Sequence, residues 1–254
     1  MFFKIIEKLN YKKNFPYFVC TPLVYGIGAA SEHISIASAY AKRTKKKLLL
    51  IKTRKLQKLL NYKVCNNALF DSLIINDHSV NKNFLYKTID ILVQVEFSLR
   101  RSLAISLKKL FKIDLGETFR FALIGSSDLY SEKKIENYNK ILPLSIKESK
   151  VDLEKKEKDK CLNLLKHLGV KDNKIVCLHV RDEGYYKDGG RRSYRNSNIN
   201  NYVSLIELLI SKNYFVFRLG DKSAAKIKYS DKKFIDYPFT SIKSEIMDLF
   251  LIKQ

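Results

Sequence analysis

Short apolar runs alternate with longer amphipathic stretches near the start of the chain, and this pattern predicts a strand–helix–strand unit. The run YFVCTPL, residues 17–23, is short and apolar and predicts a strand. The segment SEHISIASAYAKRT, residues 31–44, predicts a helix, because Ser31 can cap it, Glu32 favours its first turn and basic residues end it. The run KLLLIKT, residues 47–53, predicts a second strand that pairs in parallel with the first.

A longer helical period follows a third strand-like run, DSLIIND, at residues 71–77. From about residue 84 to residue 112 the spacing of apolar positions is that of a helix. Leucines share one face of it and basic residues share the opposite face: Leu99, Leu103 and Leu110 against Arg101, Lys108 and Lys112. Two interpretations stay open. Either the helix packs on its sheet in the ordinary way, or it rests as a basic helix on anionic lipid headgroups.

The second half of the chain repeats the alternation of strands and helices after a polar connection at residues 126–150, which has no clear period. We therefore expect one domain at residues 1–145 and a second at residues 146–254. The predicted elements of the second domain are a helix at residues 152–170 ending at Gly169, a strand at 174–180, a helix at 198–213, a strand at 214–221, a short strand within 234–239 and a helical start at 244. The fold class is therefore α/β.

Composition adds a strong preference for anions. The 254 residues include 48 Lys and Arg against 26 Asp and Glu, and the formal charge is +22. Such a surface attracts nucleic acid, an anionic membrane leaflet or phosphorylated substrates. The sequence contains no recognised nucleic-acid-binding motif, and its lysines are spread along the chain, so we expect no specific nucleic-acid partner.

The four cysteines are widely spaced and form no metal-ligand pattern, so we expect free thiols, no metal site and a reducing compartment. Charged residues interrupt the apolar N-terminus, which does not resemble a secretory signal. No stretch is long and apolar enough to predict a transmembrane helix. These features predict a cytoplasmic protein, and peripheral attachment to the inner face of the cell membrane is an open alternative.

We expect binding and catalytic residues beyond the carboxyl ends of the strands, where ligands bind in open parallel sheets. The first candidate is the segment YGIGAASEH, in which Gly26, Gly28 and Glu32 would line a cleft. The alternative is a tight turn without a ligand. The spacing departs from G-x-G-x-x-G at Ser31, which argues against a dinucleotide site.

The second candidate is the trio His179, Arg181 and Asp182, at the end of the run KIVCLHV. Arginine holds phosphate well because its planar fork donates two parallel hydrogen bonds. Asp182 could act as a base or orient Arg181. The alternatives are a hydrogen-bonded core histidine and a local salt bridge between Arg181 and Asp182.

Two further segments carry candidates for phosphate binding. Arg195 and Asn196 lie in the segment GGRRSYRNSNINNY, which is either an anion clamp or a solvated basic loop. Asn196 or Asn198 can also cap the helix that follows. Arg218 and Gly220 belong to RLGD, where a strand ends.

Taken together, these segments resemble a bacterial family assigned as glycosyltransferases. The family's second half carries H-x-R-D, then R-N-x-x-I-x-x-Y, R-x-G, an acidic residue followed by Tyr, and D-x-F-L. The matching positions here are His179, Arg181, Asp182, Arg195, Asn196, Ile199, Tyr202, Arg218, Gly220, Asp236, Tyr237 and Asp248 to Leu251. The pattern runs densely from about residue 175 to residue 251 and only loosely through the first half.

The resemblance implies a GT-B-like architecture, in which two Rossmann-like domains bind the acceptor on the first and a nucleotide-sugar donor on the second. His-x-Arg is also similar to the first motif of fucosyltransferases with this architecture, whose arginine contacts the donor pyrophosphate. Arg181 would take that role, with Arg195, Asn196, Arg218 and Gly220 as further donor ligands. Asp182 and His179 are the implied catalytic residues. The implied reaction is sugar transfer to a lipopolysaccharide- or capsule-type glycan or glycolipid, without a cofactor.

The family pattern continues beyond D-x-F-L with a further strand and a Gly/Ser-rich turn, whereas this chain ends at Gln254. We therefore expect an incomplete second domain. The alternative function is that of a truncated, non-catalytic homologue that keeps the fold and binds a glycan or partner.

Overall fold

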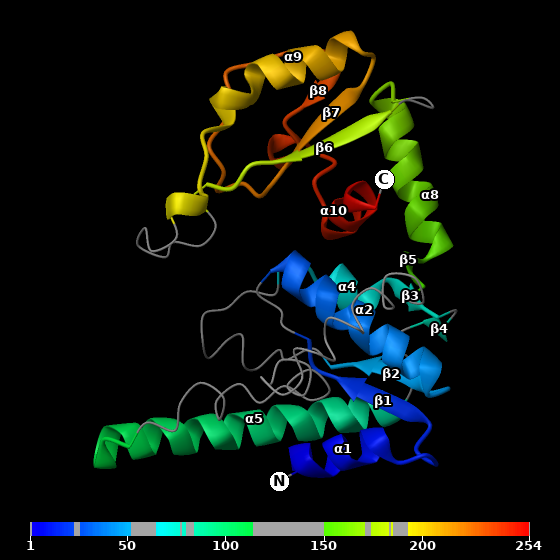
Figure 1. Ribbon diagram of the computed structural model, residues 1–254, viewed down its shortest axis with the longest axis vertical. Helices are drawn as coiled ribbons and strands as arrows, with labels where there is room; N and C mark the ends of the chain where they lie inside the picture. Colours follow the sequence, from blue (N-terminus) through cyan, green and yellow to red (C-terminus); the bar gives the residue numbers. More distant parts are fainter. Residues whose placement is uncertain are drawn as a thin grey trace. The chain divides into compact units, whose positions relative to one another are not determined.

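The computed structural model describes residues 2–22, 26–51, 65–76, 78–79, 84–113, 150–170, 174–182, 184 and 193–253. Residues 126–149 of the predicted connection lie outside this part of the chain. The chain forms two units, Met1–Glu154 and Lys155–Gln254, each of mixed α/β structure (Figure 1).

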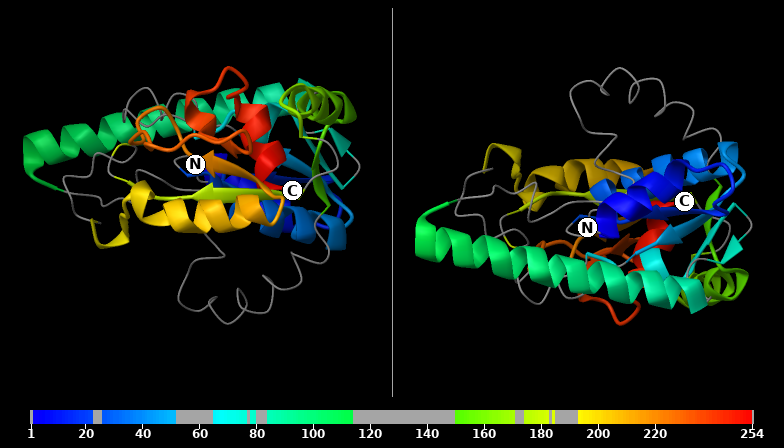
Figure 2. Two further views of the ribbon diagram at one scale, coloured as in Figure 1. Left: turned by 90° about the horizontal axis from the view of Figure 1, so that it is seen from above. Right: turned by 90° about the horizontal axis from the view of Figure 1, so that it is seen from below.

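The first unit contains the predicted strand–helix–strand motif. Strand β1 (Tyr17–Cys20) and strand β2 (Lys47–Leu50) pair in parallel, and α2 (Ile27–Arg43) connects them. Helices α1 (Phe2–Tyr11) and α5 (Phe84–Phe111) cover the face of this sheet opposite α2 (Figures 1 and 2). Their side chains form one core with the strands, comprising Ile6, Val19, Leu49, Ile51, Ile89 and Val93.

Helix α2 begins four residues earlier than predicted. Gly26 has an extended backbone, with φ −149° and ψ 134°, and its carbonyl accepts the first helical hydrogen bond from the Ala30 amide at 3.0 Å. Ser31 is therefore inside the helix and does not cap it. The prediction of a loop is wrong for Gly28, which lies within α2. Glu32 also lies in α2, as the helix prediction placed it, and Gly26 precedes the helix.

An antiparallel sheet of β4 (His78–Ser79), β3 (Leu73–Ile75) and β5 (Val151–Leu153) lies in the same unit, with α4 (Ala68–Asp71) before β3. The prediction placed Asp152 and Leu153 in a helix of the second domain. In the structure they belong to β5, which pairs with β3. Leu153 is apolar and buried in this sheet, whereas the charged residues that follow it are not buried. The first unit consequently extends to Glu154.

Helix α5 has the predicted length but not the expected buried face. Ile89, Val93 and Ala104 are buried, whereas Leu99 is 66% exposed, Leu103 51% and Leu110 70%. The leucine face therefore does not pack on the sheet.

The second unit is built on three parallel strands in the order β6 (Ile175–His179), β7 (Phe215–Leu219) and β8 (Phe234–Ile235). Helix α9 (Val203–Ser211) follows the 3₁₀ turn η4 (Ile199–Tyr202) and covers one face, while α10 (Glu245–Ile252) lies on the other (Figures 1 and 2). The remaining elements are α8 (Lys155–His167), η3 (Ser193–Arg195) and η5 (Tyr237–Phe239). Val216, Ile206 and Phe234 belong to the core under α9.

Several predicted helix ends in this unit are confirmed. Gly169, with φ +80°, ends α8 in the left-handed conformation that favours glycine. Asn198, one of the two asparagines predicted as caps, caps η4 through its side-chain oxygen. The predicted helical start near residue 244 is also present, and there Ser244 caps α10 through its side-chain oxygen. Among the described residues, no helix combines the length and the apolarity needed to cross a bilayer.

Candidate functional site

A pocket of about 440 Å³ opens at the carboxyl ends of β6 and β7. Its size falls within the range of small-molecule sites. Six of its nine lining residues are polar: Asp182, Asn196, Ser197, Asn198, Asn200 and Arg218. Val180, Ile199 and Ala225 are the apolar members. The polar groups come from separate segments of the second unit, which the parallel strands bring to one edge of the sheet.

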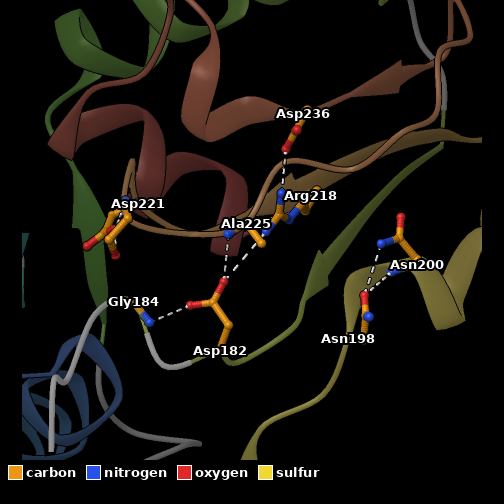
Figure 3. Close-up of polar contacts among 9 residues, drawn as sticks. Asp182, Gly184, Asn198, Asn200, Arg218, Asp221, Ala225 and Asp236 are labelled. Atoms are coloured by element: carbon orange, nitrogen blue, oxygen red, sulfur yellow. Dashed lines mark hydrogen bonds and ion pairs between the residues drawn. The ribbon is translucent and has the colours of Figure 1, made fainter.

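Arg218 is the central charge of this site. It lies in β7 on the same face as Val216, since side chains alternate along a strand, and it is only 1% exposed. One guanidinium nitrogen, Nη1, lies 3.1 Å from Asp236 Oδ1, and Nη2 lies 4.0 Å from Asp182 Oδ2 (Figure 3). Its Nε has no hydrogen-bond partner among the described residues.

Asp182 also fastens two loops together. Its Oδ1 accepts a hydrogen bond from the Gly184 amide at 3.0 Å, and its Oδ2 accepts one from the Ala225 amide at 2.9 Å (Figure 3). A Cβ at position 184 would lie 2.2 Å from the backbone oxygen of Ser223, so this close approach requires glycine. These contacts support a structural role for Asp182, which differs from the catalytic role that the resemblance implies.

The asparagine-rich segment forms one wall of the pocket. The Ser197 amide donates to the Arg181 carbonyl at 2.9 Å and holds the segment against the end of β6. Asn198 Oδ1 accepts from the Asn200 amide at 2.9 Å, as in a helix cap. The side-chain oxygen of Asn196 is buried, and no donor to it is found in the described part of the chain. An acceptor in that state is suited to a ligand hydroxyl.

The other predicted site residues lie elsewhere. His179 is the exposed last residue of β6, Arg181 is half-buried, and Arg195 is exposed in η3; none of them lines this pocket. Gly220 forms the turn after β7 with φ +151°. Gly26, Gly28 and Glu32 belong to the first unit.

Sequence reasoning missed Asp236 as the partner of Arg218, and it missed Ser197 and Asn200 as pocket residues. A signal for Asp236 was present: an arginine inside an apolar strand requires a buried acceptor, and Asp236 ends the neighbouring strand. Nothing in the local pattern distinguishes Ser197 and Asn200 from ordinary loop residues.

The arrangement is better suited to hydroxyl groups than to a bare diphosphate. Two carboxylates flank one guanidinium, so this trio carries one net negative charge. Amide and hydroxyl side chains on the wall can donate to and accept from sugar hydroxyls. Within the described residues, no group of His, Cys, Asp and Glu is arranged to hold a metal ion.

Two titratable groups of this unit have structural roles. Burial raises the pKa of the Cys177 thiol, which donates to the Leu251 carbonyl at 3.2 Å and joins β6 to α10. Burial and the nearby Asp248 raise the pKa of Tyr237, whose hydroxyl donates to the Ser244 carbonyl at 3.0 Å. The four cysteines, all within the described part of the chain, form no disulfide with one another.

Comparison with known proteins supplies no relative for this site: no family model matches the chain, and no curated protein or solved structure matches it either.

Proposed function

We propose that this chain binds a nucleoside-diphosphate sugar through its second unit and transfers the sugar to a hydroxyl of a surface-glycan acceptor. The observation that carries the proposal is the pocket. Asp182, Asn196 and Arg218 come from three separate segments of the glycosyltransferase-like pattern, and all three line it. Its place beyond the carboxyl ends of parallel strands is where α/β folds bind nucleotides.

In the proposed reaction, the acceptor oxygen forms a bond to the anomeric carbon as the bond from that carbon to the diphosphate breaks. The acceptor proton passes to a base, and the nucleoside diphosphate leaves. The Asn-rich wall would bind ribose or sugar hydroxyls. Because Arg218 is engaged by two carboxylates, the diphosphate in this proposal lies outside the pocket lining, where Arg181 and Arg195 are its ligands. The finer architecture, two Rossmann-like domains with the acceptor on the first, belongs to the same proposal.

One observation favours a second candidate, a homologue that binds a glycan without catalysis. The most buried cation of the pocket is already balanced by Asp182 and Asp236, and Asp182 is held by two backbone amides. A site of this kind can recognise sugar hydroxyls without a diphosphate.

Titration calorimetry with UDP-glucose, GDP-mannose and dTDP-rhamnose tests the proposal. One of the three should bind. Arg181→Ala should weaken that binding by about 1.5–3 kcal/mol and Asn196→Ala by about 0.5–1.5 kcal/mol, the values for charged and neutral hydrogen bonds. Asn163→Ala, on the exposed side of α8, is the control and should bind as the unmodified chain does.

Release of nucleoside diphosphate in the presence of a glycan acceptor then separates the two candidates. Release that requires both the donor and the acceptor supports transfer. Binding of free monosaccharides as tight as that of the sugar nucleotides, without release, supports the non-catalytic homologue. If neither sugar nucleotides nor monosaccharides bind, both candidates are wrong.

A further inference from the structure

Helix α5 carries more exposed large apolar residues than any other helix that the structure describes. Five of its residues lie along one face and form what we call the α5 stripe: Leu92, Val95, Leu99, Leu103 and Leu110. All five are at least 39% exposed. At about 100° per residue, they lie within about 80° of the helix circumference. The buried contacts of the helix come from the flank beside the stripe that carries Ile89 and Val93.

A heptad seam accommodates the α5 stripe only in part. With Leu92 at a d position, the a and d positions that follow include Leu99, Leu103 and Leu110, but also the polar Glu96 and Ser106. Val95 lies outside such a seam. A second helix would therefore use only part of the stripe, whereas a flat surface can contact all of it.

The charges of the same segment indicate that the flat surface is an anionic one. Residues 99–113 contain five basic residues, Arg100, Arg101, Lys108, Lys109 and Lys112, and no acidic residue. The three lysines are exposed. The Phe111 end of α5 extends well past α1 (Figures 1 and 2). Of residues 99, 100 and 102–113, only Ala104 is buried.

We propose that the C-terminal half of α5 is a docking surface for an anionic lipid bilayer. The α5 stripe enters the boundary between headgroups and acyl chains, and the lysines bind the headgroups. Lysine stems are long enough to extend around an apolar face to the phosphate level. Apolar burial and attraction to anionic lipid then act together, as in helices that lie in the membrane plane. This inference is independent of the proposed sugar transfer.

A single tryptophan can report the docking directly, because the chain contains none. Leu110→Trp places the reporter in the α5 stripe, and Tyr194→Trp places it at a position of the second unit that is also exposed. Vesicles of phosphatidylcholine with about 30% phosphatidylglycerol supply the anionic surface, and phosphatidylcholine alone is the neutral control. We expect a blue shift and quenching by brominated lipid for Leu110→Trp on anionic vesicles only, and neither effect for Tyr194→Trp.

Sedimentation of the full chain with the same vesicles tests the two contributions separately. Replacing Leu99, Leu103 and Leu110 by Ser should lower the partition coefficient at least tenfold, whereas the same change at exposed Leu162, Leu205 and Leu208 should not. Replacing Lys108, Lys109 and Lys112 by Gln should also lower it at least tenfold. Replacing Lys155, Lys156 and Lys166, which are also exposed, removes the same charge and should have little effect.

Three results would overturn the proposal. The first is an absence of vesicle binding. The second is an equal loss of binding in the control sets, which would indicate attraction by the overall charge alone. The third is a dimer of the unmodified chain in sedimentation equilibrium that the Leu99, Leu103 and Leu110 changes abolish, which would assign the α5 stripe to a second copy of the chain.

Discussion

Arg218 lies in a five-residue strand whose other members are apolar, and it is one of the most completely buried side chains of the described residues. A guanidinium in that place is stable only if carboxylates balance it, and Asp236 and Asp182 do so. The cation therefore joins the ends of all three parallel strands of the second unit.

Replacing Arg218 by Met should destabilise the protein. The change leaves two carboxylates, each about three-quarters buried, without their cation. We expect the free energy of unfolding, measured in urea, to fall by about 2–4 kcal/mol. A fully buried pair would lose more, because here both acids remain partly exposed. The control is Arg195→Met, at an exposed arginine, which should change stability by less than about 0.5 kcal/mol. Adding Asp236→Asn to Arg218→Met should restore part of the loss; if it does not, the ion pair is not the cause.

Gly184 and Gly28 should respond in opposite ways to alanine. At Gly184 the new methyl group would meet the Ser223 backbone oxygen, so the loop must move. We expect the free energy of unfolding to fall by about 1–3 kcal/mol. At Gly28 nothing lies within 4 Å of the new Cβ, and the residue is inside α2. Gly28→Ala should therefore raise the free energy of unfolding by about 0.5–1 kcal/mol. Thermal unfolding of both variants checks the two signs, and two losses of equal size would contradict the local geometry.

At the scale of an element, α2 carries a histidine in its buried face. Burial lowers the pKa of His33 to about 4, whereas the side chain has its ordinary value of 6.5 in the unfolded chain. Between these values the unfolded chain binds a proton that the folded protein does not, so stability falls as pH decreases from about 6.5 to 4.

Urea unfolding at pH 7 and pH 5 measures this effect. From the two pKa values, we expect His33 to account for about 2 kcal/mol of stability lost at pH 5. His33→Gln should remove that part of the pH dependence. His167→Gln, at the exposed end of α8, should leave it unchanged. Equal pH dependence in His33→Gln and the unmodified protein would show that His33 has the same pKa in the folded and unfolded states, and would contradict the prediction.

At the scale of the whole molecule, the candidate site was predictable only in part. Asp182, Asn196 and Arg218 were singled out from the sequence, and they line one pocket. Arg181 was expected to be central and lies outside the lining, whereas Asp236 became important only as a partner of Arg218. The two residues of that pair are 18 positions apart, and no short-range pattern joins them.

The sequence by itself determined the features that depend on near neighbours. The parallel strand–helix–strand order, the left-handed end of α8 at Gly169 and the caps at Asn198 and Ser244 all follow from hydrogen bonds and periods within a few residues. Tertiary structure decided which faces are covered. The leucines of α5 have the spacing of a core face, yet β1, β2 and α1 cover the side that carries Ile89 and Val93 instead. Periodicity shows that a helix has an apolar face, but only the packing of distant elements decides whether that face is buried.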